Sequence, residues 1–183
     1  MATTKRPKSD KEINNILFVF AMEAEAEPFR THLGLQPIEN ILPNSPCVLY
    51  SGSYKGATVT VAMNGKCPTF GVDNVGTTPA SLTTFLAINQ VHPDIVINAG
   101  TAGGFKRKTA TIGDCFLSTT VKFHDRRIPI PGFTEYGIGS YSSVACPNMV
   151  QSLKLKTGVV STSNSLDHCD ADDKLLLENG TFI

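Results

Sequence analysis

The stretch ILFVFAMEAEAE, residues 16–27, decides the fold of this 183-residue chain. Its first part, residues 16–20, is an uninterrupted apolar run with β-branched and aromatic members, which is typical of a strand buried on both faces. A helix is predicted over residues 22–33, where three glutamates stand near the start and are stabilised by the positive end of the helix dipole. A buried strand that leads at once into a helix indicates a sheet covered by helices.

The rest of the chain repeats this alternation of strand and helix. Two strands joined by the turn Tyr54-Lys55-Gly56 form a predicted hairpin, and later strands are separated by helical segments. We therefore expect an α/β fold with a mixed, mainly parallel central sheet flanked by helices, in one partial domain over residues 15–183. The predicted strands are 48–52, 57–63, 94–98, 114–121 and 156–161, and the predicted helices begin near 78, 148 and 172.

Composition excludes several classes of protein. Sixteen basic residues balance sixteen acidic ones, so no excess of positive charge favours nucleic acid or a membrane surface as a partner. Residues 1–14 carry six charges and no apolar run, which predicts a disordered tail and argues against a secretory signal; the expected location is the cytoplasm. The five cysteines form no CxxC pair, so neither a metal site nor a disulfide framework is expected.

The acidic cluster after the first strand is the first candidate site. In α/β folds, ligands bind outside the carboxyl ends of the strands, which is where residues 22–27 fall. One of these carboxylates could orient or deprotonate a water molecule. The alternative is that all three simply stabilise the start of a helix and are solvated.

The glycine-rich turn at residues 98–105 is the second candidate. Glycines let the backbone approach a ligand closely and expose amides to it, although a plain tight turn has the same composition. The spacing matches neither a dinucleotide fingerprint nor a P-loop.

Two further polar segments follow predicted strands. His124-Asp125 could be half of a catalytic triad or a structural pair, and no G-x-S-x-G elbow supplies a nucleophile. The polar residues 161–167 could line a site or close a capping turn. From the residues alone, these alternatives stay open.

Five ordered segments together resemble the nucleoside phosphorylase superfamily, and most closely methylthioadenosine/S-adenosylhomocysteine nucleosidase in its plant-type form. The resemblance runs from about residue 16 to 180. The segments are FAMEAEA (20–26), VGTTPASL (75–82), PDIVINAGTAGGF (93–105), FHDRRIPIP (123–131) and SLD (165–167).

This resemblance implies a reaction and roles for particular residues. The family cleaves the bond between adenine and a thioribose with water, in methionine salvage, without a metal or organic cofactor. Glu25 matches the catalytic, water-activating glutamate, and Met22 matches a residue under the sugar. The family is usually a homodimer whose partner chain helps close the alkylthio pocket, for which residues 128–136 are the matching loop. The other matches to nucleoside-binding residues are Thr101, Ala102, Gly103, Ile128 and Leu166.

The end of the sequence departs from the family pattern. The family continues with a Met-Glu pair that binds the ribose hydroxyls and a Ser-Asp pair whose aspartate protonates adenine, whereas this sequence closes on Asn179-Gly180-Thr181-Phe182-Ile183. Ser163-Asn164 also replaces the usual Gly-Asp. We therefore expect a fold that is incomplete at the C-terminus. A nucleosidase is expected, with a non-catalytic truncated or storage-like relative as the alternative; a phosphorylase is disfavoured because the loop 64–67 offers one lysine and no arginine to a phosphate.

Overall fold

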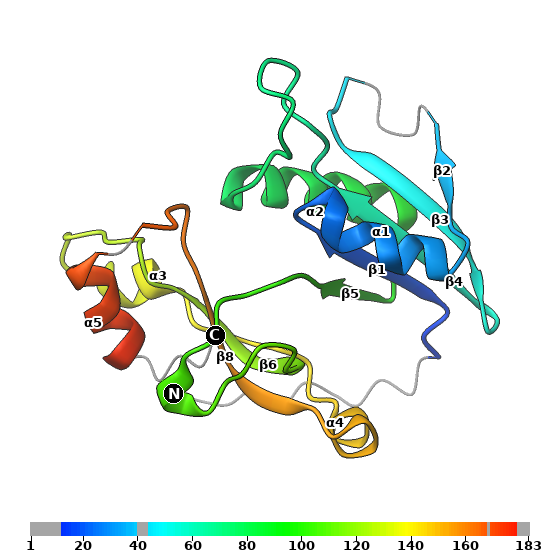
Figure 1. The fold of residues 1–183 in the computed structure, drawn as a ribbon. Coiled ribbons are helices and arrows are strands. Elements are labelled where there is room, and N and C mark those ends of the chain that lie inside the picture. Colours follow the sequence, from blue (N-terminus) through cyan, green and yellow to red (C-terminus); the bar gives the residue numbers. More distant parts are fainter. Residues whose placement is uncertain (1–11, 40–43, 168, 179–183) are drawn as a thin grey trace. The chain divides into compact units, whose positions relative to one another are not determined.

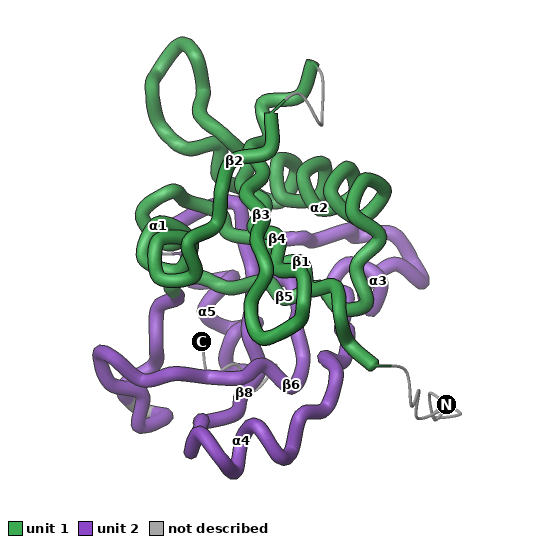
Figure 2. The backbone as a smooth tube through the Cα atoms, turned by 90° about the vertical axis from the view of Figure 1, so that its right-hand side faces the viewer, with its two compact units in different colours: residues 1–101 green, residues 102–183 purple. Residues whose placement is uncertain are grey.

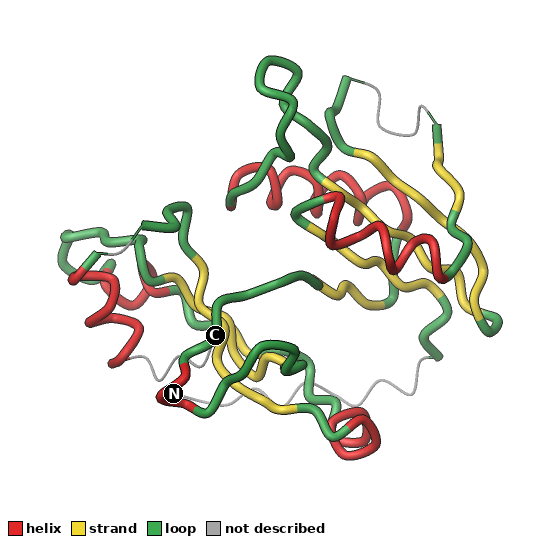
Figure 3. Tube along the Cα trace, in the orientation of Figure 1, coloured by secondary structure: helices red, strands yellow, loops and turns green. Residues whose placement is uncertain are grey.

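The computed structural model describes residues 12–39, 44–167 and 169–178. The chain divides into two compact units, residues 1–101 and 102–183 (Figure 2). Helices and strands alternate in both units, which confirms the α/β class (Figure 3). The organisation of residues 15–183 as one domain stays a prediction. Most of the predicted tail, residues 1–11, lies outside the described residues.

The first unit is a five-stranded sheet with one helix on each face (Figure 1). The strand order is β2-β3-β4-β1-β5, in which β4, β1 and β5 run parallel and β2, β3 and β4 run antiparallel. The elements are β1 (Asn15–Phe20), α1 (Glu23–His32), β2 (Gln36–Ile38), β3 (Val48–Tyr54), β4 (Ala57–Met63), α2 (Thr77–Val91) and β5 (Ile95–Asn98).

Strand β1 is the centre of this unit because its side chains feed the cores on both faces of the sheet. Leu17 and Val19 are buried with Ala87 of α2, while Phe20 is buried on the opposite face with Ala26 of α1. Fully burying an aliphatic or aromatic side chain stabilises a fold by roughly 1.5–3 kcal/mol. The two-sided burial predicted for residues 16–20 is thereby confirmed.

Asn14 marks where this unit begins. Its backbone N–H donates to Asp94 Oδ2 at 2.9 Å, and its carbonyl accepts from the Thr58 amide at 2.8 Å. Asn14, the last residue of the predicted tail, is therefore hydrogen-bonded to the first unit.

The second unit contains a three-stranded sheet of order β7-β6-β8, in which β6 and β8 are parallel and β7 is antiparallel to β6. A short 3-10 helix, Lys106–Lys108, precedes the sheet. The elements are β6 (Phe116–Phe123), α3 (Thr134–Ile138), β7 (Tyr141–Ser142), α4 (Pro147–Leu153), β8 (Lys156–Thr162) and α5 (Asp170–Glu178).

The predicted strands and helices are confirmed within a few residues, but they fall into two sheets rather than one. Four short elements were not predicted, because segments of two to five residues carry too little periodicity to be recognised. They are β2, the 3-10 helix Lys106–Lys108, α3 and β7. Among the described helices, none is long and apolar enough to cross a membrane.

Candidate functional site

The candidate site lies at the carboxyl ends of two adjacent parallel strands, β1 and β5. Strand β1 leads through Ala21 and Met22 into α1, and β5 leads through Ala99 and Gly100 to Thr101. Because β1 and β5 pair in parallel, with Val19 opposite Asn98, the two connections leave the same edge of the sheet. This is the edge at which α/β folds place their ligands.

The Glu25 carboxylate is fixed by three neutral hydrogen-bond donors. Its Oε1 accepts from the backbone N–H and the side-chain O–H of Thr101, each at 2.7 Å. Its Oε2 accepts from the backbone N–H of Met22 at 3.2 Å, which satisfies one of the amides left unpaired at the start of α1. Glu25 is half-buried, so its carboxylate is held in a defined direction beside the turn after β5.

Gly100 leaves the space that this carboxylate fills. A Cβ at position 100 would lie 3.1 Å from Glu25 Oε1 and 3.2 Å from Oε2. With a Cβ at this position, the carboxylate would have to shift from its present place beside Thr101. Gly100 lies in the glycine-rich turn predicted to face a ligand, but it is not among the predicted site residues.

The structure brings together three of the predicted site residues, Met22, Glu25 and Thr101. Thr101 contacts Glu25 directly, so its first observable role is to hold the carboxylate, and its contact with a nucleoside stays a prediction. Met22 contributes its backbone amide to Glu25, while its side chain is largely exposed.

The remaining predicted residues belong to the second unit. Ala102 and Gly103 are exposed, Ile128 is half-buried against Gly137, and Leu166 is fully exposed. Their roles in nucleoside binding stay predictions.

A second carboxylate in the first turn of α1, Glu23, is part of an ion pair. Its Oε2 lies 2.7 Å from Lys66 Nζ, and its Oε1 lies 3.5 Å from an Arg30 nitrogen. The hydrogen bond from Lys66 lowers the pKa of Glu23, and the same bond raises the pKa of Lys66. The third glutamate, Glu27, is exposed. The acidic cluster is therefore divided among three different environments.

The His124-Asp125 segment is hydrogen-bonded within the second unit. His124 Nδ1 lies 2.8 Å from Ser161 Oγ, and Asp125 Oδ2 accepts from the Asn164 amide at 2.7 Å. Arg127 forms an ion pair with Asp172. In the segment 161–167, Ser165 donates its amide to Ser163 Oγ at 2.9 Å. These contacts fit the structural alternative for both segments.

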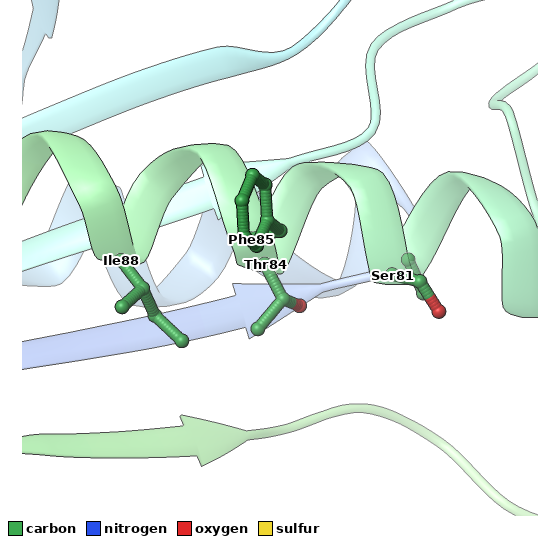
Figure 4. Close-up of a pocket in the computed structure, with 5 residues that line it drawn as sticks. Ser81, Thr84, Phe85 and Ile88 are labelled. Atoms are coloured by element: carbon green, nitrogen blue, oxygen red, sulfur yellow. The ribbon is translucent and has the colours of Figure 1, made fainter.

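A shallow apolar depression lies elsewhere in the first unit, on the exposed side of α2. Ser81, Thr84, Phe85 and Ile88 line it together with Ala80 (Figure 4). None of these five lining residues has a titratable side chain. Within the described part of the chain, no group of three His, Cys, Asp or Glu side chains gathers as a metal site would require.

Comparison with known proteins identifies the family. The model of the phosphorylase superfamily matches residues 15–179. The chain belongs to this superfamily. Among its relatives, a 5'-methylthioadenosine nucleosidase of Arabidopsis thaliana is 46% identical over 171 residues, which are 92% of this chain and 64% of the relative. The chain thus spans slightly under two thirds of that protein.

A second relative and a solved structure place the chain in the nucleosidase branch of the superfamily. A 5'-methylthioadenosine/S-adenosylhomocysteine nucleosidase of the same plant is 41% identical over 98% of this chain and 69% of its own length. The solved apo structure of Arabidopsis thaliana 5'-methylthioadenosine nucleosidase superposes with a TM-score of 0.92 at 45% identity, over 94% of this chain and 71% of that one. The plant-type resemblance found in the sequence motifs is confirmed.

Proposed function

We propose that this protein hydrolyses the N-glycosidic bond of 5'-methylthioadenosine, releasing adenine and a thioribose. S-adenosylhomocysteine, which shares the adenosine group, is a possible second substrate. The observation that carries the proposal is the Glu25 carboxylate, held at 2.7 Å by both the amide and the hydroxyl of Thr101 at the carboxyl edge of the sheet. The names of the Arabidopsis relatives supply the substrate class.

The geometry fits the chemistry of glycosidic cleavage. As the bond to adenine breaks, positive charge develops on the sugar, and a fixed carboxylate stabilises that charge. The same carboxylate accepts a proton from the attacking water, and the hydroxyl adds to the sugar carbon. Adenine leaves with the electron pair of the broken C–N bond and takes up one proton, so that the sum of the reaction consumes one water. The three donors to Glu25 are two backbone N–H groups and a hydroxyl, all of them neutral. None of these three brings a positive charge that would compete with the charge developing on the sugar.

Water, rather than phosphate, is the proposed nucleophile. A phosphorylase needs cationic groups around its phosphate. Lys66 follows β4, and its ammonium group is bound to Glu23 instead. Adenine release that proceeds at the same rate with and without phosphate supports hydrolysis, whereas a requirement for phosphate would overturn it.

The decisive experiment measures adenine release from methylthioadenosine by the purified chain and by Glu25→Gln. This substitution keeps the size of the side chain and an oxygen that can accept from Thr101, but it removes the base. General acid–base groups contribute about 10²–10⁴-fold to rate, so a loss of that order is expected.

A binding measurement by calorimetry, with methylthioadenosine and both proteins, separates the alternatives. Binding without adenine release in the wild-type chain would refute hydrolysis and favour the non-catalytic alternative. Release that Glu25→Gln leaves unchanged would refute the assigned role of Glu25.

We also propose that the protein acts in the cytoplasm as a homodimer, with residues 128–136 reaching the partner's site. In this loop the side chains of Ile130, Phe133 and Tyr136 are exposed by 54%, 44% and 60%, so they are accessible to a partner chain. Light scattering of the wild-type chain should give the dimer mass. Replacing Ile130 with Asp should shift the population toward the monomer; a monomeric wild type would refute the proposal.

A further inference from the structure

The start of α1 is held on both sides, by the turns that follow the two strands flanking β1. The strand order β4-β1-β5 places α1, which follows β1, between these two turns. On one side Glu25 accepts two hydrogen bonds from Thr101 after β5. On the other side Glu23 accepts from Lys66 after β4, at 2.7 Å. Two glutamates that are two residues apart thus tie one helix end to both neighbouring strands.

The turn that carries Lys66 has a tightly determined backbone. Gly65 has φ +72°, and a Cβ there would lie 1.8 Å from the carbonyl oxygen of Pro46, so only glycine fits. The side chain of Asn64 is buried and donates to the carbonyl of Asn74 at 2.8 Å, while the Asn74 amide group donates back to the Asn64 carbonyl at 3.3 Å. Lys66 therefore extends from a fixed point of the first unit.

We propose that Lys66 is a positioning residue, which fixes the first turn of α1 through Glu23 and thereby the Glu25 carboxylate. The proposal rests on the proposed function of Glu25. Lys66 has no assigned contact with the substrate. It acts by keeping Glu23, and with it the backbone from Met22 to Glu25, at the distance from Thr101 at which both 2.7 Å hydrogen bonds form.

The pair is solvent-accessible, so the expected effect is modest. The side chains of Lys66 and Glu23 are 54% and 40% exposed, and exposed ion pairs change equilibria by about two- to fivefold. Lys66→Met and Glu23→Gln should each lower kcat by about two- to fivefold and leave KM for methylthioadenosine within about twofold. Because both substitutions break one contact, the double variant should be no slower than either single variant.

Two matched variants distinguish positioning from a general effect of lost charge. Lys66→Arg keeps a cation within reach of Glu23, so its kcat should stay near the wild-type value, unlike that of Lys66→Met. Lys55→Met removes a lysine from the turn between β3 and β4, at the opposite end of β4, and should leave kcat unchanged.

Amide hydrogen exchange at Glu25 and Ala26 tests the same contact without catalysis. Both amides donate to the Met22 carbonyl, at 3.2 and 3.3 Å, and they report directly on the first turn of α1. Their exchange should rise in Lys66→Met and Glu23→Gln, but not in Lys66→Arg or Lys55→Met.

Failure of this inference is distinguishable from failure of the proposed function. Unchanged exchange in Lys66→Met overturns the inference, and so does faster exchange with an unchanged kcat in an active enzyme. A wild-type chain that releases no adenine refutes the proposed function, and exchange then decides alone whether Lys66 orders the helix that carries Glu25.

Discussion

The carboxyl ends of β1 and β6 are built alike but lead to different chemistry. Each strand is followed within a few residues by a carboxylate that accepts a backbone N–H from the turn after the adjacent parallel strand. Glu25 accepts from Thr101 after β5, and Asp125 accepts from Asn164 after β8, both at 2.7 Å. The Glu25–Thr101 contact holds a candidate base, and the Asp125–Asn164 contact closes a turn.

The groups around the two carboxylates differ. Glu25 is held by amides and a hydroxyl, all neutral. Asp125 is followed by two arginines, of which Arg127 has its pKa raised mainly by the hydrogen bond to Asp172 and to a smaller extent by Asp125. The guanidinium group of Arg127 is paired with Asp172, and that of Arg126 donates to the Gly137 and Tyr136 carbonyls. A strand-end position alone therefore does not mark a catalytic carboxylate.

The largest effect that tests the comparison of the two contacts is expected from Gly100→Ala, beside Glu25. The new methyl group would lie 3.1 Å from Glu25 Oε1 and displace the carboxylate. Misplacement of a reacting group by about 1 Å can cost about 100-fold in rate. The shift here is smaller, but it weakens both hydrogen bonds from Thr101, so kcat for adenine release should fall by about 10- to 30-fold. The melting temperature serves as the control, because a rate loss explained by unfolding would not support this mechanism.

A smaller loss is expected from removing only the hydroxyl that holds Glu25. Thr101→Val keeps the shape of the side chain and the backbone hydrogen bond, but it deletes the O–H donor to Oε1. A hydrogen bond to a charged group is worth about 1.5–3 kcal/mol. Because the backbone N–H of Thr101 still holds Oε1, the lower end is expected, which is about tenfold in kcat. Thr101→Ser retains the donor and should stay near the wild-type rate; equal losses in the two variants would contradict the assignment.

The sequence predicts those parts of the site that depend on short stretches of chain. Continuous apolar residues identify β1, and the match of a local motif identifies Glu25 before any coordinates are considered. The turn containing Thr101 was found in the same way. The strand is confirmed because its pattern is local in sequence, and Glu25 does contact Thr101, but the roles assigned to these two residues stay predictions.

The parts that were missed depend on strand order. Lys66 meets Glu23 across 43 positions of sequence, and it does so only because β4 lies beside β1. Gly100 is recognisable as necessary only when the Glu25 carboxylate is placed against it. For Ala102, Gly103, Ile128 and Leu166, the sequence offers a family resemblance, and their roles stay predictions.

Loss of the Asp125–Asn164 contact should lower the stability of the protein more than the rate of adenine release. Asp125→Ala removes the acceptor of the Asn164 amide, at an intermediate level of exposure. The free energy of unfolding should fall by about 1–2 kcal/mol, measured by urea denaturation. If adenine release per folded molecule fell as far as in Gly100→Ala, the Asp125–Asn164 contact would matter to catalysis as much as the Glu25–Thr101 contact, which would contradict the comparison.

The smallest effect concerns an ion pair at the other end of β6 and β8. Lys156 Nζ lies 2.6 Å from Asp114 Oδ2, and this hydrogen bond, with help from the Thr111 amide, lowers the pKa of Asp114 below 3.8. Since the folded pKa is the lower one, the pair contributes its full stability above about pH 4 and loses it as the pH falls through the folded pKa. Lys156→Met should therefore be less stable than wild type at pH 6, and the difference should shrink on acidification to pH 2. A difference that persists there would mean that Lys156 stabilises the second unit through contacts other than Asp114. These are its hydrogen bond to the Thr109 carbonyl at 3.1 Å and the Phe116 ring, whose centre lies 5.8 Å from the ammonium group.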